Sequence, residues 1–177
     1  GANMQQASAK GADFTKANLE ALDAEYANFR QTILNEIQAQ QANFANAILK
    51  GAQAMQADLR NALLSKMQGQ DINLAYSIID EVDAVGMNVT GGILTGLQAN
   101  NVDCTKAILA HIDGEYSAWK KTLFKDAELK RANLEHTNLS ETDVDKANLY
   151  ETKTNGANLV NVTNLSTALN VGDEVKE

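Results

Sequence analysis

The sequence predicts an all-β solenoid, a chain wound into stacked coils around one continuous core, and three observations lead to this fold class. Every fifth residue from Met4 to Leu159, 32 positions in all, carries neither a charge nor an amide. The position two residues before each of them is uncharged as well, so the 34 charged residues before Val160 fall on the other three phases. The 177 residues contain no proline, which would remove hydrogen-bond donors from a ladder of stacked strands. An α-helix repeats every 3.6 residues and a strand every 2, whereas a regular longer repeat is typical of solenoids.

The clearest repeat units lie near the two ends of the chain. Residues 11–20 read GADFT and KANLE, and residues 131–140 read RANLE and HTNLS. These units resemble the pentapeptide-repeat family, whose unit reads A-(D/N)-(L/F)-x-x, and the resemblance covers residues 2–159. It implies a right-handed, four-sided parallel β-helix in which four pentapeptides form one coil. The central residue of each unit and the residue two before it would point inward, and about eight coils would stack at the strand spacing of about 4.8 Å.

The middle of the chain departs from the family unit in an orderly way, because every third central position is small. The small centres are Ala9, Ala24, Ala39, Ala54, Gly69, Ala84, Ala99 and Gly114. In most of these units the residue two before the centre is large instead, as in Leu22, Ile37, Met67, Val82, Leu97 and Ile112. This exchange of volume between the two inward positions predicts a core of even density. The resulting 15-residue period leaves two alternatives open, a three-sided coil and an α-helix over residues 28–70.

The repeat ends after residue 160, which divides the chain into a β-helix of residues 1–160 and a C-terminal cap or tail of residues 161–177. Leu165 and Leu169 are four positions apart, and Asn164 or Ser166 is suited to capping a short helical turn. In the family that the chain resembles, such tails commonly close the last coil or join two monomers. The resemblance therefore implies a monomer or a tail-mediated homodimer.

The sequence offers no grouping typical of a catalytic, cofactor or metal site. Cys104 lies on the apolar phase, and His111 and His136 lie far apart in the sequence on an outward phase. Zinc needs three or four converging ligands, which these residues do not supply. The single cysteine permits no internal disulfide, which fits a cytoplasmic location, and the long uncharged runs are too polar to span a membrane. We therefore expect no enzyme activity, no cofactor, no metal and no membrane contact.

Charge provides the one candidate surface. The formal net charge is −8, and acidic proteins repel phosphate backbones, so we expect no direct binding to nucleic acid. If a coil holds four units, the position before the centre is aspartate in four of eight coils on one side. These residues are Asp23, Asp83, Asp103 and Asp143, and Asp145 flanks the same side. We interpret these five residues, the acidic face, as a candidate docking strip for a basic partner.

Two classes of function are compatible with these features. The first is a structural or protein-binding scaffold whose partner the sequence does not identify. The second follows from the resemblance, because some pentapeptide-repeat proteins bind DNA gyrase or topoisomerase IV as acidic mimics of DNA and protect the enzyme from quinolones. The chain shares the length and acidity of those proteins, but it has fewer central phenylalanines, and its segment 1–70 carries no net charge.

Overall fold

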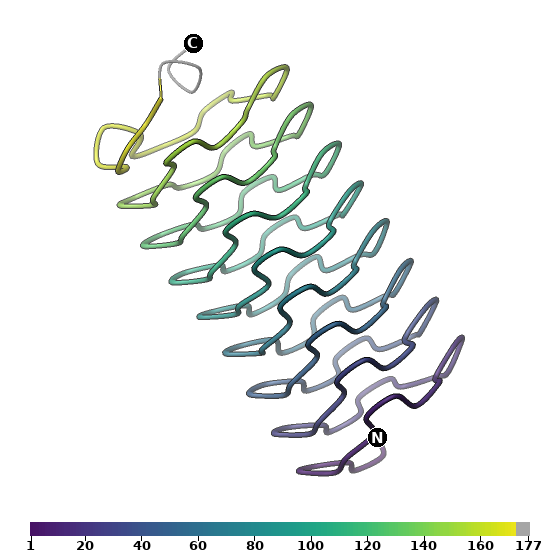
Figure 1. The fold of residues 1–177 in the computed structure, drawn as a ribbon. Helices are drawn as coiled ribbons and strands as arrows, with labels where there is room; N and C mark the ends of the chain where they lie inside the picture. Colours follow the sequence, from purple (N-terminus) through teal and green to yellow (C-terminus); the bar gives the residue numbers. More distant parts are fainter. Residues whose placement is uncertain (173–177) are drawn as a thin grey trace.

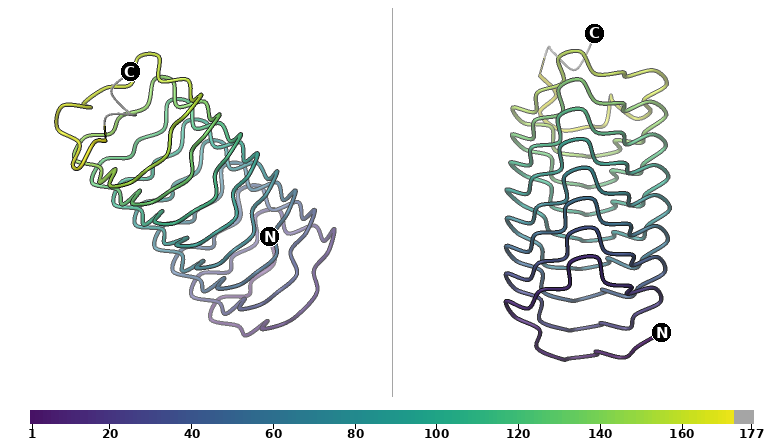
Figure 2. Two further views of the ribbon diagram at one scale, coloured as in Figure 1. Left: turned by 45° about the horizontal axis from the view of Figure 1, so that its top comes forward. Right: turned by 90° about the vertical axis from the view of Figure 1, so that its right-hand side faces the viewer.

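The computed structural model describes residues 1–172, in which the chain winds as one continuous coil from the N-terminus to the C-terminal tail (Figure 1). Parallel bridges of one residue each join positions that are four units apart in the sequence, from Asn3↔Asp23 to Asp143↔Thr163. Residues 1–172 contain no helix and no strand longer than a single bridge. Each coil therefore consists of four five-residue units and has four sides, and the coils stack into a rod (Figure 2). The 15-residue period does not set the coil, and residues 28–70 are not helical.

Each five-residue unit turns a corner in the same way. The N–H of Ala7 donates to the carbonyl oxygen of Met4 at 3.0 Å, and Gln6, the third residue of that turn, has a φ of 56°. These are the features of a type II turn, which requires a positive φ at its third residue. Every fifth residue from Gln6 to Asn161, the corner column, shares this left-handed conformation, with φ between 52° and 70°. The corner column includes no Val, Ile or Thr, because β-branched side chains fit the left-handed region poorly.

Hydrogen bonds between coils hold the rod along its axis. The N–H of Met4 donates to the carbonyl oxygen of Asp23 at 2.6 Å, and the N–H of Asp23 donates to that of Ala2 at 2.9 Å. A third bond, from the N–H of Gln6 to the carbonyl oxygen of Glu25, lies at the corner and is 2.9 Å long. The set repeats on most sides of successive coils, so the backbone groups are paired along the length of the rod.

The two inward phases form one core that runs along the rod. The six large residues predicted to compensate for small centres, Leu22, Ile37, Met67, Val82, Leu97 and Ile112, are each at most 2% exposed. The prediction of exchanged volume between the two inward positions is thereby confirmed. Aromatic rings contact one another in the first part of the core, where the centroids of Phe14 and Phe29 are 5.9 Å apart and those of Phe29 and Phe44 are 5.7 Å apart.

Polar groups inside the core bond to one another or to the backbone. Trp119, the largest core residue, is fully buried in the unit after Gly114, and its Nε1–H donates to Ser117 Oγ at 2.6 Å. The hydroxyl of Ser117 in turn donates to the carbonyl oxygen of Gly114. In residues 1–172, no buried side-chain nitrogen or oxygen lacks a hydrogen-bond partner. The core can therefore hold serine and threonine without the cost of unpaired polar groups.

The C-terminal segment continues the coil with a slip of one residue. Thr163 still pairs with Asp143 at the regular spacing, but Leu169 pairs with Asn148, one position beyond that spacing. The expected helical turn between Asn164 and Leu169 is wrong, because Asn164 adopts a φ of 61° and opens a single tight turn closed by the N–H of Thr167. The tail lays four partly buried apolar residues against the core: Val162, Leu165, Ala168 and Val171. Residues 173–177 of the predicted tail lie outside the described part of the chain.

Candidate functional site

The five aspartates of the acidic face come from four coils, and four of them lie in one column. The bridges join Asp23 to Asn43, Asp83 to Asp103 and Leu123 to Asp143, so each residue stacks above its counterpart in the preceding coil. Neighbouring members of the column are separated by the strand spacing of about 4.8 Å. Leu63 and Leu123, which are 44% and 43% exposed, interrupt the charges. The column is therefore a mixed strip of carboxylates, amides and apolar side chains rather than a continuous acidic surface.

The aspartates of this column have a structural role that does not require their charge. The Oδ1 atoms of Asp83 and Asp103 accept the backbone N–H two positions later, at 3.0 Å from Val85 and 2.9 Å from Thr105. Asparagine makes the same bond elsewhere, for example between Asn88 and the N–H of Thr90 at 3.0 Å. A side-chain oxygen at this position can accept the turn N–H, and either residue type supplies one. The negative charge on the column is thus additional to what the fold requires.

The five predicted residues differ in their surroundings. Asn164 Nδ2 donates to Asp143 Oδ1 at 2.7 Å, and Thr167 Oγ1 donates to Asp145 Oδ1 at 2.7 Å, so the tail engages both carboxylates. Asp145 also lies 3.8 Å from the ammonium of Lys125.

At the other end of the rod, Gln5 Nε2 donates to Asp23 Oδ2 at 2.7 Å. Within residues 1–172, the side-chain hydrogen bonds of Asp83 and Asp103 go to the backbone alone. These two carboxylates are therefore the most available to a partner.

Two further carboxylates stand at the corner that leads into the same side. Asp80 and Glu81 precede Asp83 by three and two positions, and Glu81 is an exposed member of the corner column with a φ of 60°. Asp80 Oδ1 accepts hydrogen bonds from the backbone and the side-chain amide of Asn100, at 2.8 and 2.9 Å. Our sequence reasoning missed this pair because it compared only the positions before each centre. Comparing the corner positions of successive coils would have found it.

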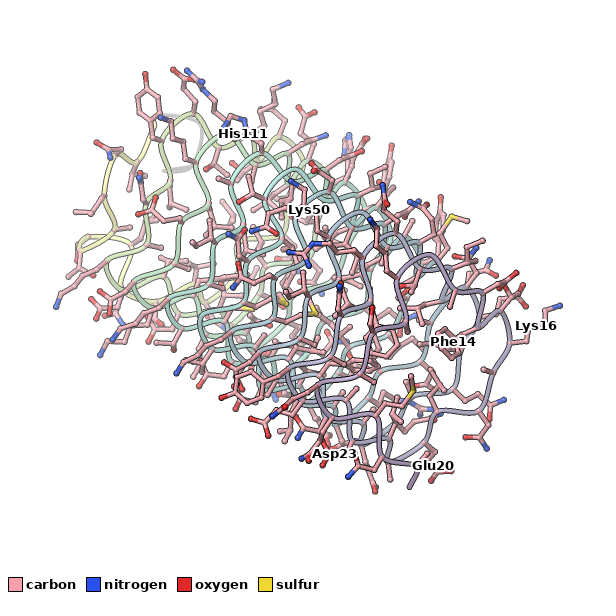
Figure 3. The ribbon with its side chains drawn as sticks, turned by 60° about the horizontal axis from the view of Figure 1, so that its bottom comes forward. Phe14, Lys16, Glu20, Asp23, Lys50 and His111 are labelled. Carbon is pink, nitrogen blue, oxygen red and sulfur yellow. The ribbon has the colours of Figure 1, made fainter. Side chains whose placement is uncertain are left out.

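Other charged and aromatic residues lie elsewhere around the rod. Figure 3 labels Asp23 and Glu20 along one edge and Lys50 and His111 toward the opposite edge. His136 stacks on Tyr116, with ring centroids 5.2 Å apart and planes within 10° of each other. The two residues are twenty positions apart, which is the length of one coil. They therefore occupy the same corner in successive coils, and this brings their rings into contact.

The reactive residue types of the chain do not converge. Cys104 is fully buried, and burial raises the pKa of its thiol far above the usual range. No group of three or more His, Cys, Asp or Glu side chains in residues 1–172 could hold a metal ion. Over the same residues, no helix is present that has the length and apolar composition needed to cross a membrane.

Comparison with known proteins identifies the family to which the repeat is similar. A family profile described as pentapeptide repeats matches residues 1–25, 25–61 and 127–163, with eight copies. The unmatched middle coincides with much of the stretch in which small centres recur in every third unit. No curated protein sequence matches the chain.

Solved structures of similar chains include HetL and two forms of QnrB1. HetL from the cyanobacterium Nostoc sp. strain PCC 7120, a pentapeptide-repeat protein involved in heterocyst differentiation regulation, is 20% identical, with 91% of this chain and 86% of HetL covered and a TM-score of 0.39. A trypsin-treated form of QnrB1, a plasmid-mediated fluoroquinolone resistance protein, is 12% identical, with 87% of this chain and 78% of that chain covered and a TM-score of 0.47. Full-length QnrB1 is also 12% identical, with coverages of 89% and 92% and a TM-score of 0.41.

Proposed function

Because this chain belongs to the pentapeptide-repeat family, we propose that it is a non-enzymatic scaffold, a rod that presents outward side chains in fixed positions to a protein partner. One observation carries the proposal. Aspartate stands at positions 83 and 103, where its oxygen bonds only to the turn N–H, a bond that does not need a charge, and where no other side chain of residues 1–172 hydrogen-bonds to the carboxylate. A charge that the fold does not need is available for recognition, so we propose a basic partner that contacts this side.

Additional carboxylates strengthen the electrostatic part of the proposal. Asp80 and Glu81 lie beside Asp83, so four carboxylates from two successive coils face the same side and its preceding corner. Exposed charges of this kind contribute little as single pairs, but a group of them steers a basic partner toward one side of the rod. The contact should weaken as ionic strength rises, because salt screens exposed charges over about 10 Å at 0.1 M.

A pair of isosteric variants tests this function without disturbing the fold. In the double variant Asp83→Asn with Asp103→Asn, the amide oxygen retains the turn hydrogen bond and only the charge is lost. The matched control is Asp13→Asn with Asp113→Asn, which removes the same charge from the equivalent position on another side of the rod.

Affinity capture from a lysate of the source organism, at low and high ionic strength, compares the three proteins. We expect a partner that binds the wild type and the control, and that is lost from the acidic-face variant and at high salt. Equal capture by both variants would exclude these two aspartates from the contact.

A second candidate function, mimicry of DNA toward a type II topoisomerase, is favoured by the local charge density. Residues 71–120 carry seven acidic and two basic side chains, a net charge of −5, over two and a half coils. At about 4.8 Å per coil this is one net charge per about 2.4 Å of rod, close to the one per about 1.7 Å of duplex DNA. The match extends over only about 12 Å, and the charges are spread over several sides.

A gyrase supercoiling assay with and without ciprofloxacin tests this second candidate. Inhibition or protection at micromolar protein that disappears in the triple variant Asp83→Lys, Asp103→Lys and Asp143→Lys would support mimicry. If active gyrase is unaffected by the wild type, or if the triple variant acts equally well, DNA mimicry through this face is refuted.

The finer architecture belongs to the same proposal. We propose that residues 1–160 form a right-handed rod of about eight coils, that residues 161–177 cap it, and that the protein works in the cytoplasm as a monomer or a tail-mediated homodimer. Leu169 supports the tail as a contact, because it is 53% exposed. Light scattering across concentration, with Leu169→Asp as the comparison, distinguishes the two oligomeric states.

A further inference from the structure

The last coils of the rod and the tail line a partly open cavity whose volume is about 170 Å³. Three threonines, Thr142, Thr152 and Thr154, line it together with nine apolar residues. In the middle of the core, by contrast, the space around Met67 and Leu74 amounts to about 10 Å³. The bridges keep their regular spacing as far as Thr163, so the difference comes from the side chains of the last coils and from the tail that lies over them.

The cavity arises where the exchange of volume between inward positions stops. In the middle of the chain a small centre is paired with a large residue two positions earlier, as Ala99 is with Leu97. In the last coils the centre Thr154 follows Thr152, and the centre Val144 follows Thr142, so neither inward position restores the lost volume. Interiors pack at nearly constant density, and a layer with two such units leaves a void.

The polar atoms around the cavity already have partners. Thr142 Oγ1 donates to the carbonyl oxygen of Leu139 at 2.8 Å, and Thr152 Oγ1 donates to that of Leu129 at 2.8 Å. No buried side-chain nitrogen or oxygen in residues 1–172 lacks a partner, so an apolar occupant would leave none of them unpaired. Nine of the twelve lining residues are apolar, so most of the surface that a bound molecule would contact is hydrocarbon.

The cavity reaches the surface through the tail. Val162 and Leu165, which line it from the tail, are only partly buried, and the lining residues Leu149 and Thr154 are 5% and 6% exposed. Core residues farther down the rod, such as Ile79 and Leu94, are 0% exposed. The tail therefore covers the cavity only in part.

We propose that this cavity is a binding site for a small apolar molecule of about the size of benzene. A cavity of about 150 Å³ lined by aliphatic and aromatic side chains is large enough to hold benzene or xenon, and the volume here is similar. The lining favours an apolar ligand over a charged one, because none of its residues carries a charge that could pair with a buried ion. The proposal rests neither on the acidic face nor on the scaffold function proposed above.

Benzene and xenon are the probes that test the proposal, with thermal unfolding and xenon NMR of the full chain as the measurements. A ligand at about ten times its Kd should raise the Tm by about 3–5 °C for a chain of this size. Xenon should show a saturable shift in its resonance. In the double variant Val144→Leu with Thr154→Leu, which fills the cavity, both responses should be lost. The control Thr105→Leu places the same substitution on an outward position and should retain them.

Either of two results would overturn the proposal. The first is the absence of any saturable response of the wild type to both probes, which does not depend on the variants folding. The second is an equal response of the wild type and the filled variant, which would locate the binding elsewhere.

Discussion

The left-handed conformation of the corner column predicts that the same substitution, alanine to glycine, changes stability in opposite directions at two positions. Ala21 lies in the column with a φ of 52° and is exposed, whereas Ala110 is the residue just before a column position and has no positive φ. We predict that Ala21→Gly stabilises the protein and that Ala110→Gly destabilises it. Each substitution removes a single methyl group, so differences in packing are kept small.

The magnitude follows from two opposing contributions. The left-handed conformation costs an L-residue with a side chain about 1–2 kcal/mol, and glycine does not bear this cost. Glycine also makes the unfolded chain more flexible, which costs about 0.4–1 kcal/mol. Ala21→Gly should therefore raise the free energy of unfolding by about 0.5–1 kcal/mol, and Ala110→Gly should lower it by about the same amount.

Urea unfolding and thermal unfolding, both followed by circular dichroism, compare the variants with the wild type. For a chain of this length the expected change in Tm is about 1–4 °C in opposite directions. If both variants lower the unfolding midpoint equally, the strain assigned to the corner column does not contribute to stability.

Three further predictions concern buried and paired groups. Ser117→Ala removes the acceptor of Trp119 Nε1–H and should lower the free energy of unfolding by about 1–3 kcal/mol, measured by urea unfolding with tryptophan fluorescence; no loss would contradict the buried hydrogen bond. Cys104, whose thiol pKa is raised by burial, should react with a thiol reagent at about pH 8 only after denaturant is added; reaction of the native protein would contradict its burial. The hydrogen bond from the side chain of Arg60 lowers the pKa of Asp58 below its usual 3.8. The ionised carboxylate therefore stabilises the fold fully at pH values above the pKa of Asp58 in the unfolded chain. This stabilisation is lost as the pH falls through the lower pKa of Asp58 in the folded protein. Asp58→Asn should flatten the acid side of the pH–stability curve, and an unchanged slope would exclude Asp58.

The sequence predicted the core well because the inward positions recur at a fixed interval of five residues. An uncharged residue at every fifth position and at the position two before it can be read without coordinates, and both phases point inward. The four-unit coil came from the resemblance to a family, since the 15-residue period alone left a three-sided coil open. The bridges join positions that are four units apart, which shows that the coil is four-sided and not three-sided.

Other features depend on backbone conformations that the spacing of apolar residues does not reveal. The corner column was overlooked, although the absence of Val, Ile and Thr from its positions is visible in the sequence. The tail was predicted to contain a helical turn because Leu165 and Leu169 have helical spacing. The left-handed conformation of Asn164 and the one-residue slip at Leu169 could not be read from spacing. The end cavity likewise follows from absent compensation, which becomes visible only once the layer is assembled.

The mismatch between the three-unit pattern and the four-unit coil gives the rod a screw symmetry. Three units are three quarters of a coil, so each successive small centre moves a quarter turn around the axis and visits all four sides within three coils. No side collects the small residues, so the rod has no thin side toward which to bend. Deletions of four units and of three units would have different effects on the rod. Loss of four units would leave every side unchanged. Loss of three units between Asp83 and Asp103 would keep the inward pattern, yet carry Asp103 to the side now occupied by Asn88.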